Sequence, residues 1–436
     1  MKGSAQTIVI TGARLTDPSV GIDDARDVAL ADGRVAEVAT RIEPPPGSVV
    51  IDASGLWLWP GLVDVHVHFR EPGYTEKETL RTGSLSAAAG GYTSVVCEPN
   101  TDPPIDCPEV ARQVIEKART AAVINVYFKA AITAGRRGQA LTDLAALHGE
   151  EGVVAFSDDG DPLVSPELME RACAAVSEMD GLLSPHCEDS PRALELYTQG
   201  VKPGFEPGSS HWNEAAYIER DLGIAGKTRC RIHFSHVSLA RSVEVIEEFR
   251  RAHDGDGRAT FEVTPHHFVL SKAAFSAGEL PTVNPPLRSE DDREALVEAL
   301  TSGVVDVIAS DHAPHTVNDV AGGASGLIGL ETTLGIVLTR FVHTGALSPL
   351  HAVELMSTAP ARIFGLPAGT LEPGTAADFV LIDPRREWTV DPEQFRSKSR
   401  NAAFPGWDLR GKAAATYRAG NQVYSEPDFS DRITRK

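Results

Sequence analysis

The spacing of apolar residues changes twice along this 436-residue chain. Residues 7–55 hold short β-branched runs separated by Asp, Gly and Pro turns, which predicts a small β unit. From about residue 57, short apolar runs alternate with amphipathic stretches of helical period. We count eight such runs with helical partners, and this alternation predicts an α/β fold, a parallel (β/α)8 barrel of the TIM type. After a helix-rich tail at 349–364, the pattern returns to β.

The predicted elements define three segments of the chain. The barrel strands are expected at 62–69, 93–97, 124–128, 152–156, 181–185, 230–234, 260–263 and 304–309. The helices are expected at 77–89, 109–118, 141–148, 166–179, 212–222, 240–250 and 291–300. We therefore assign residues 57–365 to the barrel. We expect residues 1–56 and 366–436 to form the two parts of one small β domain beside it.

Composition narrows the classes of partner. The net charge is −20 and the pI is about 5.1, which argues against nucleic acid and anionic membranes as partners. A small anionic substrate held by local arginines remains compatible with this charge. The five cysteines form no C-x-x-C pair, and an odd count argues against a disulfide framework. The first residues lack a long apolar segment, so we expect a cytoplasmic, soluble protein.

Polar residues gather where the predicted strands end. His66 and His68 are two residues apart on a strand, so their side chains share one face and can bind one metal ion. Ordinary barrel-filling histidines are the alternative for that pair alone. Other strand ends also carry ligand types, in Asp158–Asp159, His186, His236 and Asp311. In such barrels these ends form the active-site face, and imidazole and carboxylate donors suit zinc.

Eight ordered motifs carry a resemblance to a known family. They are Asp64-Val-His-Val-His-Phe-Arg-Glu-Pro-Gly, Pro99-Asn-Thr, Ser157-Asp-Asp-Gly, His186-Cys-Glu-Asp, Ser235-His-Val-Ser, Thr264-Pro-His-His, Asn284-Pro-Pro-Leu-Arg and Ser310-Asp-His-Ala-Pro-His. With them the chain resembles the class I bacterial-type dihydroorotases of the cyclic amidohydrolase superfamily. The resemblance extends from the β unit before Pro60 to the strand that begins at Ala376.

The resemblance implies a set of metal ligands. His66, His68 and Asp311 would bind one zinc ion, His186 and His236 a second, and Asp159 would bridge the two. Hydantoinases and allantoinases typically use a carboxylated lysine on the bridging strand, and here that strand end has none. Lys129 lies one strand earlier, and we interpret it as structural or solvent-facing.

The same resemblance implies the reaction and the groups that recognise the substrate. Water shared by two zinc ions gives a hydroxide nucleophile near neutral pH, and Asp311 would carry the proton to the leaving ring nitrogen. Pure metal ligation is the alternative for Asp311.

The resemblance also implies which groups recognise the substrate. The substrate carboxylate would be held by Arg70, Asn100 and His315, with His68 close by; the ring would meet Asn284, Ser325 and Gly326. A surface salt bridge with Glu71 or Glu76 is the alternative for Arg70. The glycine-rich segment 316–329 is interpreted as a mobile lid or a plain surface loop.

Two departures from the family pattern stand out. Glu98 precedes Pro99-Asn-Thr where the family usually has Met, and its carboxylate is compatible with the site only if it points into the barrel wall or pairs with a cation. The lid also lacks the usual Pro-Phe before Gly326. Our interpretation is a zinc-dependent dihydroorotase of pyrimidine biosynthesis. Its rivals are a hydantoinase- or allantoinase-like cyclic amidase and a non-catalytic partner of aspartate transcarbamoylase. We expect a homodimer or a complex with that transcarbamoylase.

Overall fold

The computed structural model describes residues 7–188, 190–205, 214–253, 255, 257–276 and 280–436. Eight parallel strands follow one another in sequence order around a barrel. They are β6 (Leu62–Val67), β7 (Tyr92–Cys97), β8 (Asn125–Ala130), β9 (Val153–Phe156), β10 (Leu182–Leu183), β11 (Arg231–Phe234), β12 (Ala259–Val263) and β13 (Val307–Ile308). A parallel bridge between Val67 and His312 joins the last strand to the first. The predicted (β/α)8 barrel is confirmed.

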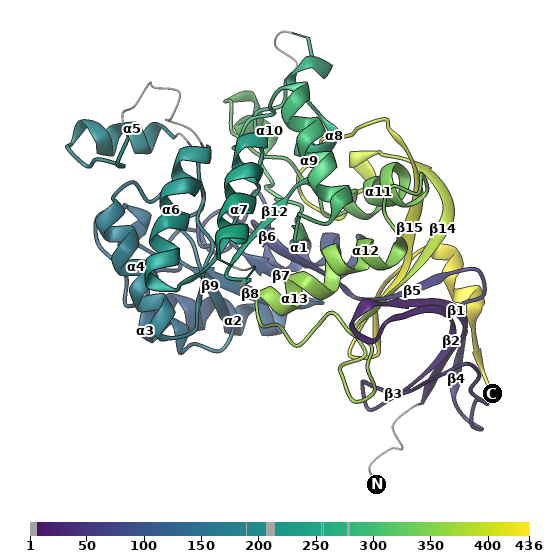
Figure 1. Cartoon of the computed structure of the whole chain (residues 1–436). Helices are drawn as coiled ribbons and strands as arrows, with labels where there is room; N and C mark the ends of the chain where they lie inside the picture. The colour runs from purple at the N-terminus through teal and green to yellow at the C-terminus, as the bar shows by residue number, and fades with distance from the viewer. Residues whose placement is uncertain (1–6, 189, 206–213, 254, 256, 277–279) are drawn as a thin grey trace.

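Helices cover the outside of the barrel (Figure 1). The helices between strands are α1 (Leu80–Ala89), α2 (Pro108–Ala121), α3 (Leu144–His148), α4 (Pro166–Glu178), α6 (Glu214–Thr228), α7 (Ala240–Ala252) and α9 (Glu290–Ser302). Their bounds differ from the predicted ones by a few residues, and the predicted start at Trp212 lies outside the described residues. The remaining helices are α5 (Pro191–Thr198), α8 (Pro265–Val269), α10 (Val317–Ala321), α11 (Thr333–Val337), α12 (Pro349–Val353) and α13 (Ala359–Ile363). A π-helical stretch (Leu338–Val342) continues α11, and another (Glu354–Thr358) joins α12 to α13 in one helical run over residues 349–363. Within the described residues, no helix is long and apolar enough to cross a membrane.

Both ends of the chain contribute to one mainly antiparallel sheet beside the barrel (Figure 1). Its strands are β1 (Ile8–Asp17), β2 (Ile22–Ala31), β3 (Arg34–Ala39), β4 (Val49–Asp52), β5 (Trp57–Pro60), β14 (Phe379–Thr389), β15 (Asp408–Arg418), β16 (Asn421–Ser425) and β17 (Ile433–Arg435). The two chain ends meet twice, because β14 pairs with β5 and β17 pairs with β4. The pairing of β5 with β14 means that residues 57–60 lie in this sheet, just before the first barrel strand.

The apolar interior explains why functional side chains collect at one end of the barrel. Residues of several strands, including Val63, Val96 and Ala155, pack against α13 and the Phe364 that follows it. This packing lines the part of the barrel next to α13 with apolar side chains. The residues that follow the strands are polar, and many of them are buried, among them Ser157, His186, His236 and Asp311. Buried polar groups need partners, so this end of the barrel is where ligands are expected.

Candidate metal centre

The first group of predicted ligands lies where β6 meets β13. His66 lies within β6 and His68 follows it, while Asp311 follows β13. The bridge between Val67 and His312 brings them together. Nε2 of His68 lies 3.2 Å from Oδ1 of Asp311, and Nε2 of His66 lies 3.6 Å from the same oxygen. The three side chains therefore present their ligand atoms to one point, as a metal ion requires.

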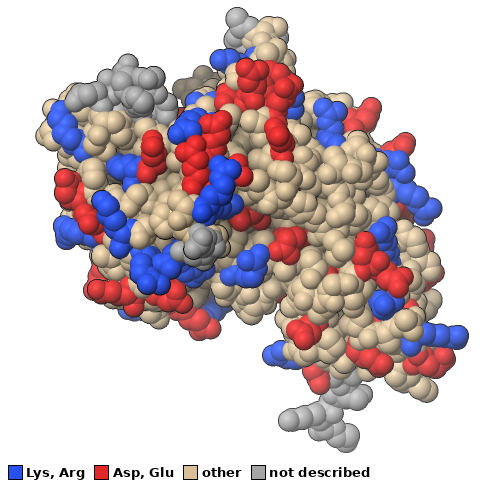
Figure 2. All heavy atoms as spheres, in the orientation of Figure 1, with Lys and Arg blue, Asp and Glu red and all other residues tan. Residues whose placement is uncertain are grey.

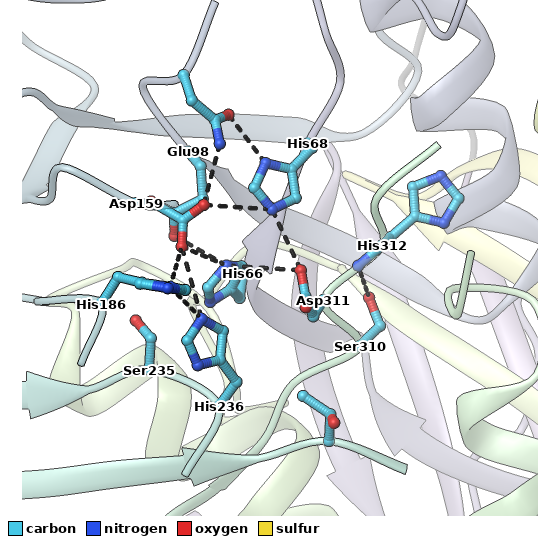
Figure 3. A network of polar contacts seen from close by, with 12 residues as sticks. His66, His68, Glu98, Asp159, His186, Ser235, His236, Ser310, Asp311 and His312 are labelled. Carbon is cyan, nitrogen blue, oxygen red and sulfur yellow. Dashed lines mark hydrogen bonds and ion pairs between the residues drawn. The ribbon is translucent and has the colours of Figure 1, made fainter. Parts of the chain in front are cut away.

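The second group comes from the ends of β9, β10 and β11. Oδ1 of Asp159 lies 3.4 Å from Nδ1 of His186, 3.6 Å from Nε2 of His236 and 3.3 Å from Nε2 of His66. Oδ2 of Asp159 lies 3.6 Å from Nε2 of His68. In Figure 3 Asp159 accordingly lies between the two groups of imidazoles. One carboxylate that faces both groups has the position that the predicted bridging ligand needs.

The two neighbouring aspartates after β9 have different surroundings. Oδ1 of Asp158 accepts a hydrogen bond of 3.1 Å from the backbone N–H of Thr133, and the Thr133 hydroxyl donates to Oδ2. Arg136 donates to the backbone carbonyls of Asp158 and Asp159. Asp158 thus anchors the loop, while Asp159 is left to face the histidines. This difference agrees with the choice of Asp159, made from the motif alone.

A buried glutamate that the sequence analysis did not single out orients the cluster. Oε1 of Glu262 lies 2.6 Å from Nδ1 of His66, and Oε2 lies 3.1 Å from Nε2 of His233. Oε1 also accepts the backbone N–H of His236 at 3.2 Å. A carboxylate that holds Nδ1–H of His66 leaves the Nε2 lone pair toward the cluster, as in many metal sites. The signal for this role was a carboxylate in the middle of the buried strand Thr260-Phe-Glu-Val.

The charge distribution fits a divalent cation. Burial alone would raise the pKa of Asp159, yet the facing imidazoles of His66, His186 and His236 hold that pKa well below its ordinary range. Conversely, burial opposes protonation of His186, but Asp159 and Glu188 raise the pKa of His186 to about 10. The carboxylates thus require nearby positive charge, which protons or a metal ion can supply.

Unpaired atoms support the same conclusion. Among the described residues, Nε2 of His66 and Oδ1 of Asp159, two atoms that face the cluster, are buried without a hydrogen bond. Buried polar atoms are rarely left in this way. The atoms of His66 and Asp159 lie in the groups that could hold an ion, and their nitrogen and oxygen donors match zinc. The residues present therefore fit a bound metal.

Of the two interpretations given for Lys129, structural or solvent-facing, the structure excludes the solvent-facing one. Its side chain is fully buried rather than solvent-facing, and its ammonium pairs with the carboxylate of Glu98. Nζ of Lys129 also donates to the Ser184 hydroxyl at 2.9 Å. The expectation that Glu98 would need a cation is confirmed. The pairing was not predicted because β7 and β8 place these two residues side by side only in the folded barrel.

Arg70 lies beside the cluster with its guanidinium group near His315. Nε of Arg70 donates to the carbonyl of Pro314 at 3.3 Å, and Nη2 lies 3.4 Å from Nε2 of His315. In the described part of the chain Arg70 forms no ion pair with Glu71 or Glu76, and Glu71 pairs with Lys117 instead. Burial lowers the pKa of Arg70 to about 10, while the carboxylates of Asp311 and Asp159 oppose that change. Arg70 therefore remains positively charged at neutral pH.

The segment predicted as a lid begins beside Arg70. Nε2 of His315 lies 2.8 Å from the carbonyl oxygen of Ser325, and burial is the main cause that lowers the pKa of His315 to about 4. The amide of Asn401 donates to the carbonyl of Gly326 at 2.7 Å. Gly326 has a φ of 144°, and a Cβ at this position would lie 2.7 Å from Cβ of Ala313. Only glycine fits this close approach.

The two predicted asparagines lie in different surroundings. Oδ1 of Asn100 lies 2.9 Å from Nδ1 of His68, and its amide donates to Oδ2 of Asp159 at 3.0 Å. Asn100 thus orients two proposed metal ligands, a contact that the sequence analysis missed. Asn284 is exposed and makes no side-chain hydrogen bond within the described residues. The structure therefore brings Asn100 into the cluster and leaves Asn284 outside it.

Sequence comparisons identify relatives over nearly the full length. The pattern of the Amidohydrolase family matches residues 57–423. A dihydroorotase from Anaeromyxobacter dehalogenans is 40% identical over 98% of this chain and 100% of its own length. The dihydroorotases of Geobacter metallireducens and Pelotomaculum thermopropionicum are 40% and 41% identical, over 96% and 98% of this chain. They cover 99% and 100% of those proteins.

Solved structures share the fold at lower identity. The L-hydantoinase (dihydropyrimidinase) of Arthrobacter aurescens matches with a TM-score of 0.84 and 26% identity, over 97% of this chain and 96% of that one. The dihydropyrimidinase of Brevibacillus agri matches with a TM-score of 0.83 and 23% identity, over 96% and 95%. The barrel, the cluster at its mouth and the near-complete alignment with curated relatives agree, and the chain belongs to the amidohydrolase family, among the dihydroorotases.

Proposed function

We propose that the protein is a zinc-dependent dihydroorotase that interconverts N-carbamoyl-L-aspartate and L-dihydroorotate in pyrimidine biosynthesis. The observation that carries the substrate assignment is Arg70, a half-buried cation beside the cluster with no carboxylate partner among the described residues. Arginine binds a carboxylate through two parallel hydrogen bonds. A substrate with a carboxylate next to the reacting amide would supply the ion-pair partner that Arg70 lacks.

The proposed metal ligands rest on two observed groups, one of His66, His68 and Asp311 and one of His66, Asp159 and His236, and His186 is added because its Nδ1 lies 3.4 Å from Asp159. His66, His68 and Asp311 would hold one zinc ion, His186 and His236 would hold a second, and Asp159 would bridge them. Bound zinc lowers the pKa of a coordinated water to near neutrality and polarises the amide carbonyl. Glu262 and Asn100 support this arrangement by fixing the rings of His66 and His68.

Asp311 is the proposed proton carrier. Next to the imidazoles of His66 and His68 the pKa of Asp311 is lowered in spite of burial, so its carboxylate is ionised at neutral pH, which is the state that a proton acceptor requires. In the hydrolytic direction Asp311 would take a proton from the attacking water and return it to the ring nitrogen that leaves. Microscopic reversibility makes the same carboxylate the donor and acceptor in ring closure.

Arg70, Asn100 and His315 are the proposed carboxylate-binding groups, with His68 at their edge. Arg70 and His315 already lie within 3.4 Å of each other. At neutral pH His315 is uncharged because its pKa is low, so Arg70 would contribute the charge. The single N–H of His315, at Nε2, donates to the Ser325 carbonyl in this structure and would have to turn to the substrate carboxylate. Asn284, Ser325 and Gly326 are proposed to meet the ring. Exposed Asn284 would reach it only if its loop moves, as a closing lid allows.

The proposed assembly and location follow from family membership and charge. We propose a homodimer, with a complex with aspartate transcarbamoylase as a further assembly, and a cytoplasmic location. The division into 1–56, 57–365 and 366–436 is retained as a proposal for the domains. On the face in Figure 2, acidic and basic side chains lie interspersed, without the basic field that nucleic acid would need. The molar mass in solution, alone and with the transcarbamoylase, tests the assembly.

A competition between substrates tests the function. The metal content of the purified protein should be measured first, followed by ring closure of carbamoyl aspartate and hydrolysis of hydantoin and allantoin. The structural similarity to hydantoinases makes the uncharged rings the relevant alternative. We expect turnover of carbamoyl aspartate, and activity restricted to the uncharged rings would refute the proposal. Bound zinc without turnover, alone or with the transcarbamoylase, would favour a non-catalytic partner.

A further inference from the structure

Glu98 and Lys129 form a buried ion pair below the proposed metal centre. Glu98 follows the last residue of β7, Lys129 lies in the neighbouring strand β8, and both side chains are fully buried. The Lys129 ammonium also bonds to the Ser184 hydroxyl, whose oxygen lies 3.1 Å from that of Ser235. Burying two charges costs several kcal/mol each, so the pair requires an explanation beyond packing.

The Glu98 carboxylate points toward a proposed metal ligand. Oε1 of Glu98 lies 3.6 Å from Nε2 of His66, the nitrogen that Glu262 leaves unprotonated. Glu98 belongs to the polar network of Figure 3. Apart from the ion pair with Lys129, neither oxygen of Glu98 has a hydrogen bond among the described residues. A buried carboxylate usually accepts several, so this one has unused acceptor capacity.

The observed separation is the one expected between two ligands of the same ion. Donor atoms about 2.0–2.2 Å from a tetrahedral zinc ion lie about 3.3–3.6 Å from each other. Nε2 of His66 lies 3.6 Å from Oε1 of Glu98, 3.3 Å from Oδ1 of Asp159 and 3.6 Å from Oδ1 of Asp311. In its distance to this one nitrogen Glu98 matches the two aspartates, while its second close contact is the Lys129 ammonium and theirs are other ligand imidazoles.

We propose that Glu98 is an additional carboxylate ligand of the metal centre, held in position by Lys129. The inference rests on the proposed metal-dependent function and extends it to two residues that no family motif assigns. Lys129 balances the negative charge of Glu98 and holds Oε1, the same oxygen that lies nearest Nε2 of His66. In the proposed site this oxygen would be shared between the Lys129 ammonium and the ion bound by His66. The competing explanation is a purely structural pair.

Two variants separate these explanations. Glu98→Gln keeps the size of the side chain and removes its charge. The double variant Glu98→Met/Lys129→Met removes both charges and leaves an apolar pair of similar length, which buried ion pairs usually tolerate. For each protein we would measure zinc stoichiometry, zinc affinity by chelator competition, and the visible spectrum of the cobalt-substituted form. The stability of the metal-free form is measured by urea unfolding.

If Glu98 binds the metal, both variants lose affinity for at least one ion by about 10- to 100-fold or more, and their cobalt spectra change. The double variant should show this loss of zinc affinity although its metal-free form remains about as stable as the metal-free wild type. If the pair is only structural, zinc affinity and the cobalt spectrum of the double variant match the wild type, and the inference is wrong. If the double variant does not fold, the spectrum and affinity of Glu98→Gln decide in the same way. A wild-type protein that binds no metal would instead refute the proposed function.

Discussion

At the scale of single residues, His66 shows how the cluster is prepared for an ion. Its Nδ1 lies 2.6 Å from Oε1 of Glu262, and this hydrogen bond orients the ring so that Nε2 points to the centre of the site. His68 is fixed similarly by Asn100, at 2.9 Å from Nδ1. Rings held in this way lose little freedom when they bind a metal, because their tautomer and orientation are already set.

The first prediction concerns proton transfer by Asp311. Asp311→Asn keeps the shape of the side chain but removes the basic oxygen, so we expect kcat to fall by about 10²- to 10⁴-fold. The dissociation constant for dihydroorotate should change far less. Steady-state kinetics and equilibrium binding measure the two quantities, and zinc content is determined alongside because Asp311 is also a proposed ligand. An Asn variant that holds its zinc and turns over normally would remove the proton-carrier role.

The second prediction concerns substrate recognition by Arg70. Arg70→Ala removes a charge-assisted contact worth about 1.5–3 kcal/mol, so we expect KM for carbamoyl aspartate to rise by about 10- to 100-fold or more. Zinc content should be unchanged. Arg70→Lys is the matched control: it keeps the charge without the planar pair of donors, so an intermediate KM is expected. Loss of zinc in the Ala variant would show that Arg70 supports the metal centre instead.

Predictability at this scale depends on where a residue lies relative to its strand. His68, His186 and Asp311 were singled out because polar residues at strand ends break an apolar pattern. Glu262 and Lys129 lie inside strands, and only the solvent-facing alternative for Lys129 was wrong, because lysine is usually exposed. Its partner Glu98 is distant in sequence, so only the folded barrel shows that the two charges compensate.

At the scale of elements, α1 supports the strand that carries the ligands. The helix begins with a capping box, in which Thr79 and Thr82 satisfy each other's backbone N–H groups. Gly83 of α1 lies against Phe69, the residue between His68 and Arg70. The helical spacing of apolar residues predicted this helix, but with its start at Lys77 instead of Leu80. The short loop helix α5 was missed, and its position was not deducible because eight residues carry little periodic signal.

The third prediction tests this contact. A Cβ at Gly83 would lie 2.4 Å from Cδ1 of Phe69, so Gly83→Ala forces the ring to move. We expect a loss of stability of about 1–3 kcal/mol, which exceeds the gain of about 1 kcal/mol that Ala offers in a helix. Urea unfolding measures the loss. The value of kcat/KM should also fall because Phe69 lies between His68 and Arg70.

Gly223 in α6 provides the matched control. It is an exposed helical glycine, and a Cβ added to it would meet no neighbouring side chain within 4 Å. Gly223→Ala should therefore raise stability by up to about 1 kcal/mol and leave kinetics unchanged. If Gly83→Ala stabilises the protein to the same extent, the close approach to Phe69 is not a constraint on α1.

At the scale of the whole molecule, the two chain ends hold the small sheet together and the C-terminal part supports the barrel. The β character of both ends was predicted, and so was the family. The contacts between the ends had no local signal, because strands such as β4 and β17 come from opposite ends of the chain. Glu331 makes a second long-range link: it accepts hydrogen bonds from the Ser86 hydroxyl of α1 and from the backbone N–H groups of Arg396 and Ser397.

The fourth prediction follows from the charge of Glu331. Burial, only partly offset by its hydrogen bonds, raises the pKa of Glu331 from 4.5 to about 7. A carboxyl group with a raised pKa binds its proton more tightly in the folded state. Its contribution to stability is therefore complete below pH 4.5 and is lost as the pH rises toward 7. The difference of about 2.5 units corresponds to about 3 kcal/mol at most.

Glu331→Gln should remove this part of the pH dependence, because the amide resembles the protonated carboxyl at every pH. Relative to the wild type, the variant should gain stability between pH 5 and pH 8, measured by urea unfolding at both values. Glu298→Gln, on the exposed side of α9, is the control and should show no such difference. Equal shifts in the two variants would mean that the pKa of Glu331 is the same in the folded and unfolded protein, so that its hydrogen bonds fully offset burial. A Gln variant that instead loses stability relative to the wild type as the pH rises would show that these hydrogen bonds outweigh burial, and that the link between α1 and the C-terminal segment strengthens with pH.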